Sequence, residues 1–261
     1  MKKTALLSLL ALMIMGGVNA QQINRQSNAA DGLLSGGKTI LKANVLGWAT
    51  RNFGFYGEQI ISKNISAVLG VNIMPQGGVP YISRFSDDPQ LEDIRIGTFS
   101  FTPEVRFYLS RSGYGKGFYI APYYKYERFK ASNLLIEFED QNSVPQEINL
   151  KGNLNTHSGG AIIGIQWLAG KKKRIALDWT IIGAHYGTNK ALFNGTSSHE
   201  MSAEEQASLK QEIIKNLNDI EIGGKKIAEV ERVDVSSTSA EAKTKGPWAF
   251  IRSSFSIGYR F

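Results

Sequence analysis

The stretch "SSFSIGYRF", residues 253–261, alternates strictly between two kinds of side chain. Phe255, Ile257, Tyr259 and Phe261 are apolar or aromatic, and small or charged residues separate them. This period of two predicts a β-strand with one apolar face and one polar face. At the edge of a soluble sheet such a strand would be prone to aggregation, whereas closure of the sheet into a barrel removes the edge.

The same alternation recurs in seven further segments, which lie at residues 39–48, 52–60, 66–74, 97–109, 117–128, 159–168 and 175–186. Each runs about nine to thirteen residues, the length that a tilted strand needs to cross a bilayer, and is longer than most soluble strands. One face of each segment is strongly apolar and the other is polar and rich in glycine. The pattern predicts an all-β fold, an eight-stranded antiparallel transmembrane β-barrel. A soluble β-sandwich is the alternative.

The lengths of the connections support the barrel. Short links follow the second, fourth and sixth segments, at residues 62–64, 110–116 and 169–174. Long links follow the third, fifth and seventh, at residues 75–96, 129–157 and 187–247. Short periplasmic turns on one rim and long extracellular loops on the other are typical of outer-membrane proteins, and only the short first hairpin near Thr50 departs from this rule.

The N-terminus predicts export. Lys2 and Lys3 precede an apolar run, and small residues around Ala20 suit cleavage, so residues 1–20 are expected to be a signal peptide. A retained membrane anchor is the alternative, although the run is short for a span. Residues 21–37 are then expected to form a periplasmic segment and residues 38–261 the barrel. The predicted location is the outer membrane of a Gram-negative bacterium.

The amino-acid composition excludes some kinds of functional site. The chain has no cysteine, which excludes disulfides and cysteine-bound metals. Its mean hydropathy of −0.19 suits a barrel with a polar interior. The formal net charge is +7, but an exported protein is not expected to bind nucleic acid, so the lysines are interpreted as solvated. The basic run at residues 171–174 predicts a periplasmic turn beside anionic lipid headgroups.

Two resemblances extend this interpretation. Phe255, Ile257, Tyr259 and Phe261 resemble the C-terminal insertion signal of outer-membrane proteins, which implies the barrel assembly machinery as a partner. The segments "LKANVLG", "EQIISKNIS", "PEVRFYL" and "GFYIAPYYKY" resemble an uncharacterised family of small Bacteroidetes outer-membrane barrels, a domain of unknown function. That resemblance implies the fold and a surrounding of outer-membrane lipid, but no chemistry.

Charged residues occupy the polar faces of the segments. An eight-stranded barrel is just wide enough for side chains to fill it, and unpaired buried charge is costly, so these residues are expected to pair in the lumen. The result would be a largely closed, salt-bridged structural or interaction protein of the cell envelope; a narrow channel is the alternative. The predicted lumen residues are Lys42, Glu58, Glu104, Arg106, Lys125, Glu127, Asp178, Arg252 and Arg260.

Catalytic and metal sites are not predicted. The three histidines are His157, His185 and His199, and none belongs to a recognisable nucleophile motif or has ligand spacing. His157 and Ser158 open the sixth segment, and His185 is expected on the lipid-facing side of the seventh. No catalytic residue, metal or cofactor is therefore expected, and a lipid-modifying enzyme is the least favoured alternative.

The loop at residues 187–247 contains a predicted helix. Ser202 and Glu205 have the spacing of a capping box, and apolar residues follow at helical spacing, at Leu209, Ile213, Ile214 and Leu217. Gly223 and Gly224 are expected to end the helix. Its apolar stripe is expected to pack against the protein's own loops or against an extracellular or envelope protein.

Overall fold

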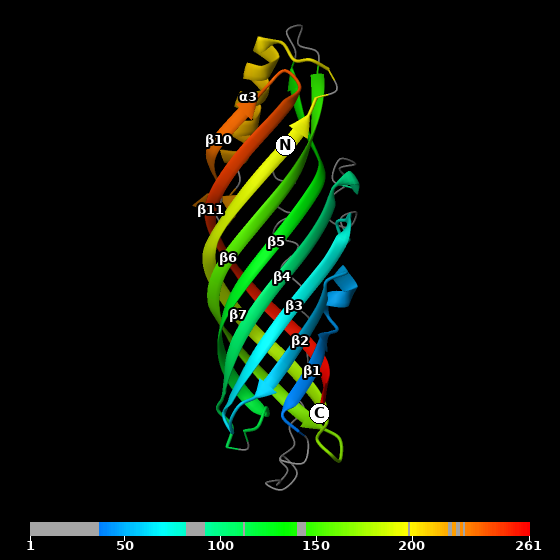
Figure 1. Ribbon diagram of the computed structural model, residues 1–261, viewed down its shortest axis with the longest axis vertical. Coiled ribbons are helices and arrows are strands. Elements are labelled where there is room, and N and C mark those ends of the chain that lie inside the picture. Colours follow the sequence, from blue (N-terminus) through cyan, green and yellow to red (C-terminus); the bar gives the residue numbers. More distant parts are fainter. Residues whose placement is uncertain are drawn as a thin grey trace.

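The computed structural model describes residues 37–81, 92–111, 113–139, 145–197, 199–218, 221–222, 225–226 and 228–261. The expected signal peptide and nearly all of the expected periplasmic segment lie outside these residues. The chain forms one antiparallel sheet in which the first strand also pairs with β11, so that eight strands close into a ring (Figure 1). The predicted all-β fold with eight ring strands is confirmed at this level.

The ring is built in chain order. It consists of β1 (Thr39–Asn44), β2 (Phe53–Ile60), β3 (Ile65–Gly78), β4 (Arg95–Tyr108), β5 (Gly117–Glu139), β6 (Pro145–Ala169), β7 (Ile175–Thr196) and β11 (Ser239–Arg260). The strand β10 (Glu229–Val235) extends the sheet beyond β11, and β8 (Glu221–Ile222) pairs with β9 (Lys225–Lys226). A 3₁₀ turn, η2 (Gly47–Thr50), joins β1 to β2.

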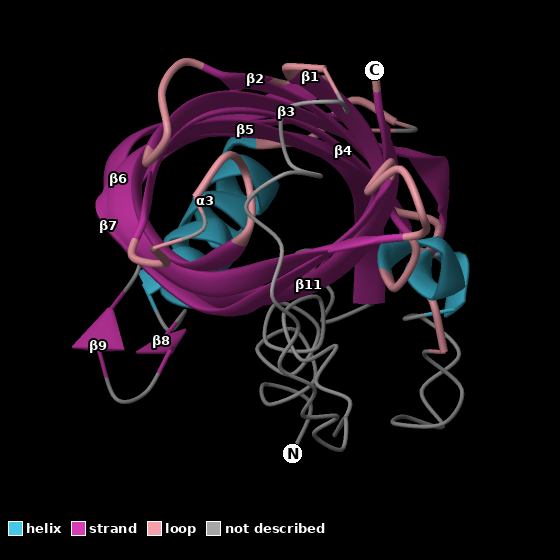
Figure 2. Cartoon of the chain, turned by 90° about the horizontal axis from the view of Figure 1, so that it is seen from below, coloured by secondary structure: helices cyan, strands magenta, loops and turns pink. Residues whose placement is uncertain are grey.

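The ring closes at residues 253–261, the alternating C-terminal stretch. Ile40 of β1 lies opposite Arg260 of β11, and the register continues to Asn44 opposite Ser256. The Phe261 amide also donates a hydrogen bond to the Thr39 carbonyl at 2.8 Å. Seen along the ring, the strands enclose a continuous wall (Figure 2). The alternating strand is therefore paired on both sides, because β7 lies along its other side.

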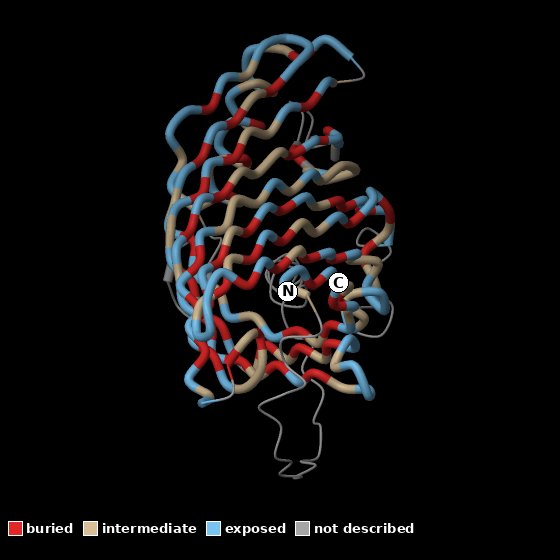
Figure 3. The backbone as a smooth tube through the Cα atoms, turned by 60° about the horizontal axis from the view of Figure 1, so that its bottom comes forward, coloured by how far each residue is buried: buried red, intermediate tan, exposed pale blue. Residues whose placement is uncertain are grey.

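Burial alternates along the strands, as Figure 3 shows. In β2 the inward residues Tyr56 and Glu58 are buried, whereas the outward Phe53 and Phe55 are exposed. The other ring strands repeat the pattern because successive side chains of a strand point to opposite faces. The ring therefore buries polar and charged side chains inside and exposes large apolar side chains outside, the reverse of a soluble domain.

The strands differ greatly in length. β5, β6, β7 and β11 contain 22–25 residues, whereas β1 and β2 contain 6 and 8. One wall of the ring is consequently much taller than the other (Figure 1). The turns at residues 61–64, 109–116 and 170–174 gather at the end where the chain finishes, close to their expected positions.

Three predicted loops are shorter in the structure than expected. The β5–β6 connection spans residues 140–144 instead of 129–157, the β7–β11 connection spans 197–238 instead of 187–247, and the β3–β4 connection spans 79–94 instead of 75–96. Many residues in these regions are polar and still continue the strands, because ladder hydrogen bonds hold a strand that lacks an apolar outward face. The apolar alternation used for prediction marks only the lower part of the tall wall.

The helix α3 (Ala203–Asn218) begins with the predicted capping box, which is confirmed. The Glu205 amide donates to the Ser202 Oγ at 3.2 Å, and the Ser202 amide donates to the Glu205 Oε2 at 2.7 Å. The pKa of the Glu205 carboxyl lies below its ordinary value, mainly because the carboxylate accepts this second hydrogen bond. The helix ends at Asn218, and the predicted stop at Gly223 and Gly224 lies outside the described residues.

The apolar stripe of α3 packs on the inner face of the tall wall. Leu209, Ile213 and Leu217 share one core cluster with inward residues of β5, β6 and β11, among them Leu150 and Ala242. Seen along the ring, α3 lies within its outline (Figure 2). The stripe is therefore covered by the chain itself. Across the described residues, no helix is both long and apolar enough to pass through a membrane.

Candidate functional site

Six charged side chains meet inside the ring near its short-turn end. Three are cations and three are carboxylates, and they come from strands far apart in the sequence: Lys42 on β1, Glu58 on β2, Glu104 and Arg106 on β4, Asp178 on β7 and Arg252 on β11. Closure of the sheet brings them together, because inward positions on opposite walls then face one another. We call these six residues the interior ion network.

Lys42 joins two of the carboxylates. Its Nζ lies 2.7 Å from the Glu58 Oε2 and 2.6 Å from the Asp178 Oδ2, and it also donates to the Gln166 Oε1 at 2.9 Å. The lysine side chain has no exposed surface. Its three contacts match the three hydrogens of an ammonium group, so its donors are fully used.

Arg106 occupies the middle of the network. Its Nη1 lies 2.7 Å from the Asp178 Oδ2, and its Nη2 lies 3.1 Å from the Glu104 Oε2. The guanidinium also stacks on the Tyr119 ring, 4.2 Å from the ring centroid. Glu104 accepts a further contact from the Arg252 Nη2 at 3.3 Å. Glu104 is therefore shared by two arginines.

Neutral side chains complete the shell around the carboxylates. Tyr108 and Ser66 donate to the Glu58 Oε1 at 2.7 and 2.6 Å, and Tyr119 donates to the Asp178 Oδ1 at 2.8 Å. Gln166 donates to the Glu58 Oε2 at 3.2 Å. A carboxylate buried away from water needs such partners on both oxygens. The network is thus charge-balanced and densely hydrogen-bonded.

The remaining predicted lumen residues lie outside the network. Lys125 and Glu127 form their own pair at 2.5 Å, farther along β5 toward the long-loop end. Arg260 lies at the short-turn end, where its Nε donates to the Gly37 carbonyl at 2.8 Å. The structure therefore brings together six of the nine predicted residues and places the other three at two other levels of the interior.

Sequence reasoning missed the neutral partners. Tyr108, Tyr119, Ser66 and Gln166 occupy the same alternating positions as the predicted charges. The alternation of the strands alone could have identified them as inward residues, since residues that share a face of a strand are two apart. What parity could not supply is which of them meet, because that depends on the stagger between strands.

The expected position of His185 is wrong. Residue 181 is an extra residue in β7, since Ile163 and Gly164 of β6 lie opposite Ile182 and Thr180. This β-bulge reverses the parity of the strand above it. His185 is consequently buried inside the ring, where its Nδ1 lies 2.8 Å from the Tyr123 hydroxyl.

His157 and Ser158 do not form a pair. His157 is exposed on the outer face, with its Nδ1 2.5 Å from the Tyr124 hydroxyl, whereas Ser158 is buried inside. Adjacent strand residues point in opposite directions, so the serine and this histidine lie on opposite sides of the wall. Within the residues that the structure describes, no three His, Cys, Asp or Glu side chains are grouped to hold a metal ion.

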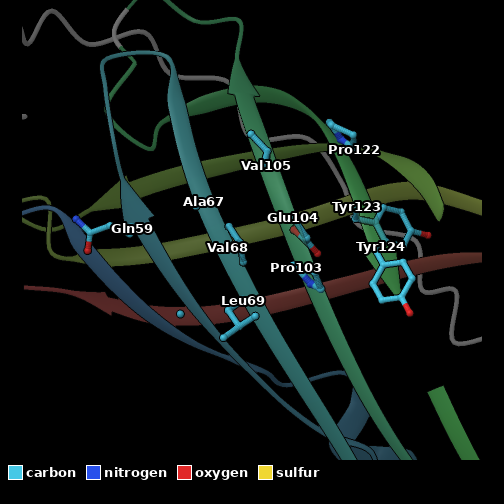
Figure 4. Close-up of a pocket in the computed structure, with 11 residues that line it drawn as sticks. Gln59, Ala67, Val68, Leu69, Pro103, Glu104, Val105, Pro122, Tyr123 and Tyr124 are labelled. Atoms are coloured by element: carbon cyan, nitrogen blue, oxygen red, sulfur yellow. The ribbon is translucent and has the colours of Figure 1, made fainter. Parts of the chain in front are cut away.

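A shallow apolar groove crosses the outer face over β2 to β5 (Figure 4). Its outward walls include Gln59, Ala67, Val105 and Tyr124, and Pro103 lies beneath it. Glu104 and Tyr123, which are buried, also border it. It belongs to the apolar exterior of the ring.

The sequence matches the family model described as "Protein of unknown function (DUF3575)" over residues 7–211. The matched residues include β1 to β7 and the first part of α3, and they stop before β11. No curated protein and no solved structure matches the chain.

Proposed function

Because the chain belongs to the family of unknown function DUF3575, whose description assigns no activity, we propose a function from the two faces of the ring: a sealed outer-membrane β-barrel that serves as a structural or interaction protein of the cell envelope. The proposed location is the outer membrane of a Gram-negative bacterium, in line with the resemblance to Bacteroidetes barrels. The short turns face the periplasm, and the tall wall with α3 extends outside the cell.

One observation carries this proposal: the ring exposes apolar side chains and buries charges. Leu41, Phe55, Phe118 and Leu109 expose 54, 54, 53 and 66% of their surface, and they belong to an apolar exterior that all eight strands share. Exposed apolar surface this extensive is rare on monomeric soluble proteins. In a bilayer it faces acyl chains, and the closed ring satisfies the backbone hydrogen bonds that lipid cannot.

The interior ion network supports a sealed lumen rather than a channel. Three cations and three anions with direct contacts leave no net charge to attract an ion. Tyr108, Tyr119 and Gln166 fill positions between them. An eight-stranded barrel has little interior volume beyond its side chains. A permeating ion would have to separate paired charges in a low-dielectric interior.

Conductance across planar lipid bilayers tests the sealed lumen. The wild-type protein, refolded and inserted, should give no steady single-channel current. The double variant Glu104→Ala/Arg106→Ala is the comparison. It removes two large side chains from the centre of the network and should therefore have a wider lumen. Steady current steps from the wild type, at the same amplitude as this variant, would favour the narrow channel.

Assembly is proposed to depend on the outward residues of β11. Phe255, Ile257, Tyr259 and Phe261 lie on its outer face, as the proposed signal for the barrel assembly machinery requires. Phe261→Ala should lower the amount of membrane-inserted protein without lowering export. Ala249→Phe, also on the outer face of β11, is the control and should insert normally. Wild-type insertion of the Phe261→Ala protein would argue against this signal.

A further inference from the structure

The groove on the outer face lies over a weakened seam of the ring. The register between β4 and β5 pairs Phe101 with Tyr126 and Phe107 with Ile120, which sets Pro103 opposite Tyr124 and Pro122 opposite Val105. At neither of these two positions do β4 and β5 form a ladder pair. Proline has no backbone N–H to donate to a ladder. The groove of Figure 4 lies over this seam, with both prolines in its lining.

Two short turns lie below the groove and are packed against each other. The Tyr114 amide of the β4–β5 turn donates to the Lys63 carbonyl of the β2–β3 turn at 2.6 Å. Gly113 allows this approach, because its φ is +52° and a Cβ there would lie 2.1 Å from the Lys63 carbonyl oxygen. The Tyr108 amide likewise donates to the Asn64 carbonyl at 2.7 Å. The two turns therefore form one surface.

The charged residues of this surface are all cations. It carries Lys63, Arg111 and Lys116, and neither turn contains an aspartate or a glutamate. Lys63 and Arg111 are exposed, and Lys116 is partly exposed. In the described part of the chain, no carboxylate forms an ion pair with any of the three. Their charge is available to an anion from outside the protein.

The spacing between the groove and these cations suits one lipid molecule. Ala67 of β3 lies four residues after Lys63 of the preceding turn, and Pro122 of β5 lies six residues after Lys116 of the preceding turn. At about 3.3 Å per residue these separations are roughly 13 to 20 Å before strand tilt is considered. One leaflet of the hydrocarbon core is about 15 Å thick. An acyl chain in the groove would therefore place its headgroup at the two turns.

We propose that the groove and the two turns form a binding site for an anionic phospholipid of the periplasmic leaflet. The chain occupies the apolar groove over the Pro103–Pro122 seam, and Lys63, Arg111 and Lys116 hold the phosphate. This inference rests on the proposed membrane location. It assigns a specific lipid site to one side of the ring, in which a basic surface and an apolar groove lie together.

Native mass spectrometry of the detergent-solubilised protein tests the site. The probes are phosphatidylglycerol and phosphatidylcholine with identical acyl chains. Phosphatidylglycerol should bind at least about tenfold more tightly, since each basic side chain near an anionic headgroup adds roughly one kcal/mol and 1.4 kcal/mol is tenfold. The triple variant K63Q/R111Q/K116Q should lose this preference.

A matched variant separates a site from general basicity. K171Q/K172Q/K173Q removes the same number of charges from the β6–β7 turn, and it should keep the preference. For the groove, Ala67→Phe should weaken the binding of both lipids, whereas Ala249→Phe on the outer face of β11 should not. Equal binding of the two lipids by the wild type, or equal loss in both triple variants, would overturn the site.

The outcomes also separate this inference from the proposed function. A protein that is recovered from membranes and gives no lipid preference keeps the membrane proposal and loses the site. A protein that remains in the soluble fraction of cells loses the membrane proposal itself.

Discussion

At the scale of the residue, each charge inside the ring depends on partners from other strands. Glu104 is the clearest case, since its two oxygens contact Arg106 and Arg252. Burying a charge costs several kcal/mol, and only direct pairing and hydrogen bonds offset that cost. Loss of one partner therefore harms the network more than the lost contact alone would suggest.

Glu104→Gln and Arg106→Gln should each lower the free energy of unfolding by roughly 3–5 kcal/mol, because each leaves an uncompensated buried charge. The measurement is the denaturant midpoint of the folded protein in detergent. Lys243→Gln is the control, since its pair with Glu241 is exposed and should contribute about 0–1 kcal/mol.

The double variant Glu104→Gln/Arg252→Gln supplies a second check. It removes one charge of each sign, so its loss should be smaller than the sum of the two single losses. If Glu104→Gln and Arg106→Gln both unfolded at the wild-type midpoint, the network would not be a stabilising plug.

At the scale of the element, the first turn of α3 contains a carboxyl group, that of Glu205, whose ionisation affects the helix. The folded-state pKa of Glu205 lies below its ordinary value of 4.5, chiefly because the carboxylate accepts the Ser202 amide hydrogen bond. The ionised carboxylate therefore stabilises the helix start above that ordinary value, and this stabilisation is lost as the pH falls through the lowered pKa.

Hydrogen exchange of the amides in residues 203–218 should thus accelerate as the pH falls below the ordinary carboxyl value of 4.5, after correction for intrinsic rates. Glu205→Gln should remove most of this pH dependence, because the amide keeps a hydrogen-bond acceptor but carries no charge. Ser202→Ala should lower protection across the whole range. An unchanged pH dependence in Glu205→Gln would rule out this carboxyl as the cause.

The position of α3 also changes what removal of its loop should do. Replacing residues 197–238 by a short Gly/Asn turn leaves every residue of the interior ion network in place, so the ring should still resist SDS without heating. The inner face of the tall wall would lose its cover, however, and Phe138, Ile148 and Leu150 would be exposed.

In lipid vesicles, where the membrane covers the apolar exterior of both proteins, the shortened protein should therefore bind more of a hydrophobic dye than the wild type does. Adding Ile148→Thr and Leu150→Thr should reduce dye binding, because these residues share the inner face of β6. Failure of the shortened chain to form any SDS-resistant species would mean that the ring needs the loop in order to fold.

At the scale of the whole molecule, the two ends of the ring are chemically different. One end has three short turns that contain Lys63, Arg111 and Lys171–Arg174, and the other has the tall wall and α3 (Figure 1). The proposed topology assigns the first end to the periplasm. Protease added from outside should therefore distinguish the two.

Trypsin added to intact cells should cut the β7–β11 connection, where Lys226 is exposed, and should leave the lysines of residues 171–173 uncut. The latter turn should become a substrate only after the envelope is permeabilised. The opposite order of cleavage would show that the protein is inserted the other way round.

The sequence by itself determined the strand pattern and its two faces. Alternation from Phe255 to Phe261, and in seven other segments, predicted eight ring strands with the charged residues inside, and the capping box predicted the start of α3. These features are local, since a strand's period and a helix cap are written in neighbouring residues.

The tertiary structure alone decided the rest. Polar stretches of β5 and β6 became strands because they pair with each other, one extra residue in β7 turned His185 inward, and α3 packed on the inner wall. Which charges meet, such as Lys42 with Asp178, follows from ring closure and strand stagger. These outcomes depend on residues far apart in the chain, so no local pattern encodes them.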